Sequence, residues 1–132
     1  DLARLNFYYS TTGYIFSLRG NGNAVLTGTL FQNSDERLKK NIVPLKNTLN
    51  KLSQLNAYTY QWKDTSRGNE EQLGLLAQEV EKQFPQLVMT DEKGKKSVAY
   101  ANMVPILMTA IKEQQDQIEE LRKLVTAKIE VK

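Results

Sequence analysis

The stretch Asn33-Ser34-Asp35-Glu36-Arg37-Leu38-Lys39-Lys40-Asn41-Ile42 separates two parts of the chain that have different sequence patterns. Before it, apolar and aromatic runs alternate with Gly, Ser and Asn clusters, which is typical of short β-strands. After it, most apolar residues recur at helical spacing. The sequence therefore predicts an α+β fold with a short N-terminal β stalk, a small mixed α/β domain and a long C-terminal helix.

Ser34 and Lys39 in this stretch have two possible roles. In the first, Ser34 or Asp35 caps a helix, which is common for a polar residue before charged ones. In the second, an uncharged lysine amine takes the serine proton, and the alkoxide attacks a carbonyl. Free lysine has a pKa of about 10.4, so such a site must desolvate Lys39. Residues five apart do not share a face of a regular helix, so this dyad also requires an irregular backbone or a lysine that reaches back.

Composition limits the chemistry that is available. The chain has 132 residues, of which 40% are hydrophobic and 25% charged, as expected for one modest globular core. It contains no cysteine and no histidine, so we predict no metal and no cofactor, and any catalysis must use Ser, Lys, Asp, Glu or Tyr. The lack of an initiator methionine and a start inside a predicted strand suggest a C-terminal piece of a longer chain.

Charge and hydropathy bear on two classes of partner. A formal charge of +3 would permit nucleic-acid binding, but the basic residues are interspersed with acidic ones, so we predict no nucleic-acid partner. No apolar run approaches the roughly 18 residues of a membrane span, so we predict no membrane partner.

Residues 1–33 read as the end of a β structure. Short strands are predicted at residues 7–9, 14–18 and 24–31, with turns at residues 10–13 and 20–23. Such strands are too few to bury a core by themselves. We therefore expect them to pair with copies of themselves at the end of a trimeric fibre; the alternative is a plain meander on the following domain.

The middle of the chain predicts a small mixed core. Leucines at 45, 49, 52 and 55 suggest one face of a helix that begins at Pro44. Residues 57–63 alternate as a strand, with three aromatic side chains on one face. A helix over residues 77–84 and a hairpin of residues 87–90 and 97–100 follow; the predicted buried positions are Tyr58, Tyr60, Trp62, Leu76, Val80 and Phe84.

The last helix carries a heptad pattern from Met103 to Val125. Apolar residues dominate one seam, which indicates an oligomeric coiled coil rather than a helix packed only on its own domain. The polar Gln114 in this seam is a candidate determinant of register or stoichiometry. Dimer and trimer both remain open from these positions, which are Val104, Leu107, Ile111, Gln114, Ile118, Leu121 and Val125.

Four blocks of the chain resemble a known family in the same order. They are residues 32–42, 57–63, 73–88 and 98–114, and the first contains the Ser34 and Lys39 pair. Together they resemble the C-terminal intramolecular chaperones of phage tailspikes and tail fibres, the endosialidase-type self-cleaving peptidases. The resemblance implies that Ser34 is the nucleophile and Lys39 the general base, and it favours a homotrimer over a dimer.

The resemblance leads to a detailed expectation. Attack by Ser34 on its own carbonyl would close a four-membered ring, whereas attack on the Asn33 carbonyl closes a five-membered ring, so cleavage is expected between Asn33 and Ser34. Asp35, Gln78 and Glu79 are candidates for the surrounding pocket, although Gln78 and Glu79 could instead cap a helix. The expected organisation is a fibre stalk at 1–33, an auto-processing chaperone at 34–102 and a trimeric coiled-coil helix at 103–132.

The expected function is to trimerise and fold an upstream fibre of the same chain in the host cytoplasm during phage assembly. Cleavage would then release the chaperone from the virion and leave residues 1–33 in the fibre. Three other classes remain: a trimerisation module that does not cleave, a nucleic-acid-binding module, and a secreted hydrolase acting in trans.

Overall fold

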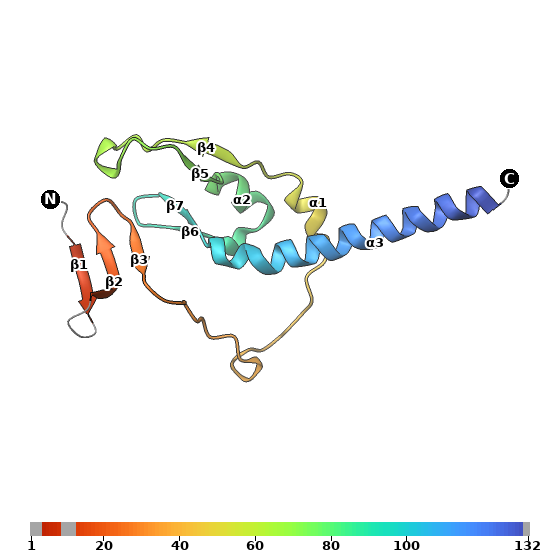
Figure 1. Ribbon diagram of the computed structural model, residues 1–132, viewed down its shortest axis with the longest axis horizontal. Coiled ribbons are helices and arrows are strands. Elements are labelled where there is room, and N and C mark those ends of the chain that lie inside the picture. Colours follow the sequence, from red (N-terminus) through yellow and green to blue (C-terminus); the bar gives the residue numbers. More distant parts are fainter. Residues whose placement is uncertain (1–3, 9–12, 131–132) are drawn as a thin grey trace. The chain divides into compact units, whose positions relative to one another are not determined.

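The structure, a computed structural model, describes residues 4–8 and 13–130 and has the predicted mixture of short strands and helices (Figure 1). Its contacts divide into two units, which we describe separately. The first contains the described residues up to Ile42 and Tyr60–Gln72; the second contains Val43–Thr59 and the described residues from Leu73 onward. The strands are β1 (Arg4–Tyr8), β2 (Tyr14–Arg19), β3 (Ala24–Leu26), β4 (Tyr58–Tyr60), β5 (Gln72–Gly74), β6 (Val88–Thr90) and β7 (Lys96–Val98), and the helices are α1 (Thr48–Leu52), α2 (Ala77–Gln83) and α3 (Met103–Glu130).

The first unit contains an antiparallel meander in the order β1-β2-β3. Phe7 lies opposite Phe16 with ring centroids 5.8 Å apart, and Phe16 lies opposite Leu26 on its other side. Five of the large apolar side chains of this meander are more than 40% exposed, namely Leu5, Phe7, Ile15, Leu18 and Leu26. The meander therefore buries little apolar surface within one chain.

The third strand was predicted over residues 24–31, but it ends at Leu26, and the chain then runs without regular structure as far as the short 3-10 turn at Glu36–Leu38. The predicted strand residue Tyr9 and residues 10–12 of the first predicted turn lie outside the described residues. The second predicted turn is present between β2 and β3, where Gly22 has φ +86° and its amide donates to the Arg19 carbonyl at 2.9 Å.

The predicted helix from Pro44 through Leu55 is wrong over most of its length. Only the five residues of α1 are helical. Asn47, immediately before α1, adopts a left-handed conformation with φ 57°, which a continuous α-helix does not permit. Leu45 lies before this break and is 48% exposed. The leucine spacing that suggested one helix therefore spans a break in the helical backbone at Asn47.

The second unit has a compact apolar core. Val80 of α2 and Phe84, the residue after its last turn, pack with Leu87, Met103 and Ile106, and all five are less than 9% exposed. Leu76, predicted to share this face, precedes the first turn of α2 and is 48% exposed, so that assignment was wrong. The partly buried residues around this core come from five different segments and are Leu52, Leu55, Leu75, Val88 and Val98.

The two smaller sheets of the chain are two-stranded pairs. Strand β4 pairs with β5, and β6 pairs with β7 as the predicted hairpin, in which Val88 lies opposite Val98. The charged turn of this hairpin is ordered by Asp91, whose Oδ1 accepts from the backbone amides of Lys93 and Lys95 at 2.9 and 2.8 Å. Trp62, predicted to continue the aromatic face of β4, lies beyond the strand and is 37% exposed.

The long helix α3 has two apolar faces near its N-terminal end. Met103, Ile106 and Ala110 are buried against the core of the second unit. The predicted seam residues lie on another face and are exposed, and from Gln114 to Ile129 every residue is exposed. Among the described residues, none of the helices combines the length and apolar character needed to cross a membrane.

Candidate functional site

Ser34 and Lys39 meet across a single short turn in the first unit. Lys39 Nζ donates a hydrogen bond to Ser34 Oγ at 2.8 Å. Between them, Glu36–Leu38 forms one 3-10 turn, and Lys39 itself is extended with φ −116° and ψ 152°. The backbone is thus irregular, as the dyad interpretation required. The three-residue turn brings together two side chains that a regular helix would direct to different faces.

Asp35 builds the turn that holds this pair. Its Oδ1 accepts from the backbone amide of Arg37 at 2.9 Å, and both of its carboxylate oxygens accept from the Arg37 guanidinium at 2.6 to 3.1 Å. This side-chain hydrogen bonding is the main cause that holds the pKa of Asp35 below its usual range. The carboxylate therefore caps the turn in its charged form, and the predicted cap coexists with the Ser34–Lys39 contact.

The site is open to solvent in the single chain. Asn33, Ser34, Asp35 and Lys39 are all exposed. A hydroxyl nucleophile and an amine in direct contact can support acyl transfer if the amine is uncharged, and burial favours the uncharged form of lysine. Within the described residues there is no group of three or more acidic side chains that could hold a metal ion.

Gln78 and Glu79 lie on α2 in the second unit. Gln78 is exposed, whereas Glu79 Oε1 accepts a hydrogen bond from the Tyr58 hydroxyl at 2.7 Å. This contact with the carboxylate raises the pKa of Tyr58, and the second oxygen of Glu79 is buried without a hydrogen-bond partner. The structure thus gives Glu79 a partner on β4, and its predicted role in a cleavage pocket remains a prediction.

The predicted seam forms a continuous exposed stripe along α3. Exposed fractions range from 40% at Ile118 to 64% at Ile111 among its apolar members. Gln114 is exposed as well. The stripe lies beside the buried face of Met103, Ile106 and Ala110 but does not include it, so α3 can pack on its own unit and still present the seam residues Val104, Leu107, Ile111, Ile118, Leu121 and Val125.

Two interactions were not predicted from the sequence. In the first unit, the Arg67 guanidinium lies 3.6 Å from the centroid of the Trp62 ring, and its Nε donates to the Asn21 carbonyl at 3.3 Å. In the second unit, Glu113 of α3 accepts hydrogen bonds from the start of α1. The hydrogen bonds of Arg67 to Asn21 and of Glu113 to the start of α1 join residues more than 40 positions apart, and no local sequence pattern indicates either of them.

Comparison with known proteins adds a family and a set of relatives. Residues 34–89, which include the Ser34 and Lys39 pair, match the family described as chaperone of endosialidase. The chain is similar to a long tail fiber protein Gp37 of Salmonella phage S16, with 36% identity over 110 residues, or 77% of this chain and 15% of the relative.

Two shorter relatives give the same description. The chain is 33% identical over 128 residues to a long tail fiber protein Gp37 of Enterobacteria phage Ox2, covering 91% of this chain and 48% of the relative. It is 32% identical over 135 residues to a protein of the same name from Enterobacteria phage M1, covering 51% of that relative. The chain therefore spans at most about half the length of the relatives that it matches.

Proposed function

Because residues 34–89 match the family described as chaperone of endosialidase, we propose that the chain belongs to this family and is a self-cleaving, trimeric chaperone for a phage tail fibre. In this proposal, residues 1–33 are the end of the fibre stalk, residues 34–102 form the auto-processing domain, and residues 103–132 form the coiled-coil helix. Assembly takes place in the host cytoplasm. Cleavage leaves the stalk in the virion and releases the chaperone.

The observation that carries the catalytic part of the proposal is the hydrogen bond of 2.8 Å between Lys39 Nζ and Ser34 Oγ. A nucleophile and its base must lie within about 2.6–3.2 Å for direct proton transfer, and this pair meets that requirement without rearrangement. The rigid turn capped by Asp35 supports the same geometry, because it fixes the backbone between the two side chains.

The proposed reaction is an acyl shift followed by hydrolysis. Uncharged Lys39 takes the Ser34 hydroxyl proton as Oγ attacks the Asn33 carbonyl carbon, and the five-membered ring collapses with loss of the bond to the Ser34 nitrogen. That nitrogen receives the proton and becomes a free amine, while Asn33 is held as an ester on Ser34 Oγ. Water then hydrolyses the ester, which leaves a carboxylate on Asn33 and a hydroxyl on Ser34.

Trimer formation supplies the burial of the seam and of Lys39 that the single chain lacks. The exposed seam of α3 is apolar at six positions, and burying it between three copies removes these side chains from water. We assign the burial that Lys39 needs to the same assembled state, since the pair is exposed in one chain. Cleavage before assembly is thereby disfavoured.

A trimerising helix also speeds the pairing of stalk strands from separate chains. Pairing of strands between separate chains is slow, because the entropy of bringing the chains together precedes any favourable contact. The described meander leaves Leu5, Phe7 and Ile15 about half exposed, which is consistent with partners from other chains. Joining three chains through α3 raises the effective concentration of their stalk strands. Removal of the chaperone afterwards leaves the folded fibre kinetically stable.

The test is cleavage of the full-length precursor and its variants, followed on denaturing gels with N-terminal sequencing. The wild type should release a fragment that begins at Ser34. Residues 34–132 have a mass of about 11 kDa, in proportion to the 15.1 kDa of the 132-residue chain. Ser34→Ala and Lys39→Ala should abolish release while sedimentation still shows trimers. Lys39→Arg should also fail, because a guanidinium does not act as a base near neutral pH.

The control variant is Lys40→Ala, which removes the neighbouring charge but leaves the pair intact. It should cleave at a rate close to that of the wild type. If Ser34→Ala or Lys39→Ala releases the same fragment at the wild-type rate, the dyad assignment is wrong. Intact trimers with no fragment from the wild type would support a trimerisation module that does not cleave.

A further inference from the structure

Helix α1 is too short to be stable by itself. It has five residues, whereas isolated helices below about 12 residues are marginal in water. Its N-cap residue, Asn47, has a left-handed backbone and makes no side-chain capping hydrogen bond. The first amides of α1 therefore need acceptors from elsewhere in the chain.

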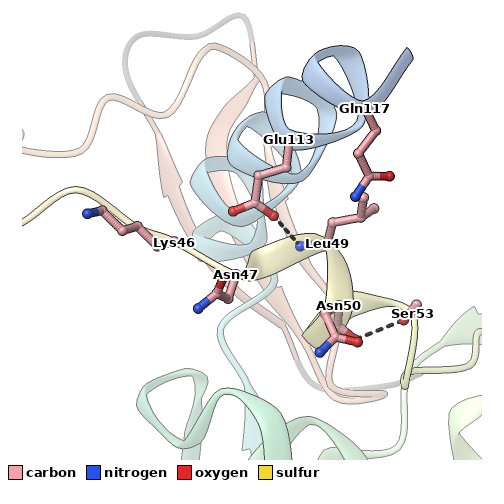
Figure 2. A pocket seen from close by; sticks show the side chains of 7 residues that line it. All are labelled: Lys46, Asn47, Leu49, Asn50, Ser53, Glu113 and Gln117. Atoms are coloured by element: carbon pink, nitrogen blue, oxygen red, sulfur yellow. Dashed lines mark hydrogen bonds between the residues drawn. The ribbon is translucent and has the colours of Figure 1, made fainter. Parts of the chain in front are cut away.

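Glu113 of α3 provides these acceptors (Figure 2). Its Oε2 accepts from the Leu49 amide at 2.8 Å, and its Oε1 accepts from the Thr48 amide at 3.2 Å. The Thr48 hydroxyl donates to Oε2 at 3.3 Å, and Thr48 is 2% exposed. The carboxylate thus connects the start of α1 to α3, and Leu49 and Glu113 are 64 positions apart in the chain. We name these three contacts the α1 clamp.

The α1 clamp sets the length of the irregular segment between Lys39 and α1. Residues 40–47, here called the linker, join the Lys39 end of the dyad turn to α1, are all exposed and contain no helix or strand. With α1 held on α3, the linker is eight residues long. If α1 were released, the next residue packed against the core would be Leu55, and the connection would lengthen to the 15 residues 40–54.

We propose that Glu113 is the positioning residue that connects residues 34–39, here called the dyad segment, to the trimerisation helix α3. This inference rests on the proposed function and adds the route by which assembly of α3 reaches Ser34 and Lys39. A short linker keeps the three dyad segments, and the stalk ends before them, close to the helices that join the chains. Lengthening the linker from eight to 15 residues lowers the effective concentration of the dyad segments near these helices about 2.5-fold, by the three-halves power of loop length.

Glu113 suits this role because it lies outside the seam. It follows Ile111 by two positions, and Glu120 follows Ile118 in the same way, so the two glutamates occupy equivalent places in successive heptads. Glu120 is exposed, and no contact with the start of α1 involves it. Glu120→Gln is therefore a matched control for Glu113→Gln, with the same loss of charge at the same heptad position.

The experiment compares the wild type, Glu113→Gln and Glu120→Gln in the full-length precursor. Three quantities are measured for each: the trimer fraction by sedimentation, the exchange rate of the Thr48 and Leu49 amides, and the time course of fragment release. We expect trimers in all three. Only Glu113→Gln should show faster amide exchange and slower fragment release, by up to about 2.5-fold when α1 is fully released.

A second control separates positioning from general stability. Val80→Ala weakens the core of the second unit without touching the α1 clamp, so it provides a variant destabilised to a similar or greater degree. It should keep the wild-type cleavage rate under conditions where it is folded. Equal slowing by Val80→Ala and Glu113→Gln would show that Glu113 acts through stability alone.

Failure of this inference differs visibly from failure of the proposed function. If the wild type cleaves and Glu113→Gln cleaves at the same rate despite faster exchange at Leu49, the positioning role is refuted and the dyad stands. If the wild type releases no fragment at all, the self-cleaving function fails, and the positioning role fails with it.

Discussion

The substitution Ile118→Asp tests the trimeric helix at a position where the structure gives a magnitude. Ile118 is 40% exposed in the single chain, so about two-fifths of its side chain remains to be buried by partners. Complete burial of such a side chain is worth about 1.5–3 kcal/mol, which leaves about 1 kcal/mol per chain and about 3 kcal/mol per trimer. Since 1.4 kcal/mol is a tenfold change, the lost burial alone should weaken trimerisation about a hundredfold.

Three aspartates brought together in one layer of the seam would weaken assembly further, through desolvation and mutual repulsion. The assay is sedimentation over a range of protein concentrations, with circular dichroism to show that each chain keeps its fold. Lys123→Asp, at an exposed position outside the seam, is the control and should remain trimeric. Unchanged trimers in Ile118→Asp would remove the coiled coil from the account.

Two further predictions concern the second unit. Phe84 is 6% exposed in the core, so Phe84→Ala should lower the free energy of unfolding in urea by roughly 3–5 kcal/mol. The control is Leu73→Ala, at an 81% exposed position, which should change it by no more than about 0.5 kcal/mol. Hydrogen bonds from the backbone amides of Leu49 and Thr48 hold the pKa of Glu113 below its usual range, so the stability from the α1 clamp is present above the unfolded-state pKa and is lost as pH falls through the lower folded-state value. The protection of the Leu49 amide against exchange should therefore fall in the wild type as pH is lowered through this acidic range. The same pH-dependent step in Glu113→Gln would contradict the assignment. The exposed Lys46 is the other charged group that lines the pocket beside Glu113.

Local patterns predicted the elements whose determinants are local. The helix ended by Pro85, the hairpin across the Asp91 turn and the long helix from Met103 all occur where their spacing indicated. In each, the apolar period and the turn residues lie within a few positions of one another. These elements form where they were predicted because the tertiary contacts favour the same structure as the local pattern.

The helix predicted from Pro44 failed for the opposite reason. Its leucine spacing was regular. However, Asn41 and Asn47, which lie on either side of Leu45, both have positive φ, and a continuous α-helix cannot include residues in this conformation. Asparagine tolerates this conformation better than most residues, yet nothing in its immediate neighbours shows when it adopts it. The start of α1 is set by Glu113, which lies more than 60 positions away and carries no local signal.

The dyad was predictable in part. The pair of residue types was visible in the sequence, and so was the need for an irregular backbone, which the turn at Glu36–Leu38 provides. The roles of Asp35 in capping the turn and of Arg37 in pairing with it follow from contacts between neighbours. The surroundings that would bury Lys39 could not be predicted, because a single chain leaves the pair exposed.

The most direct measurement of the central claim is the mass of the products that purified precursor releases, with and without hydroxylamine. Hydroxylamine attacks esters much faster than peptide bonds, so an ester between Asn33 and Ser34 Oγ should yield a stalk fragment that ends in a hydroxamate at Asn33. The account predicts this product from the wild type, a carboxylate at Asn33 without hydroxylamine, and neither product from Ser34→Ala. A fragment that begins at any residue other than Ser34, or equal release from Ser34→Ala, would contradict it.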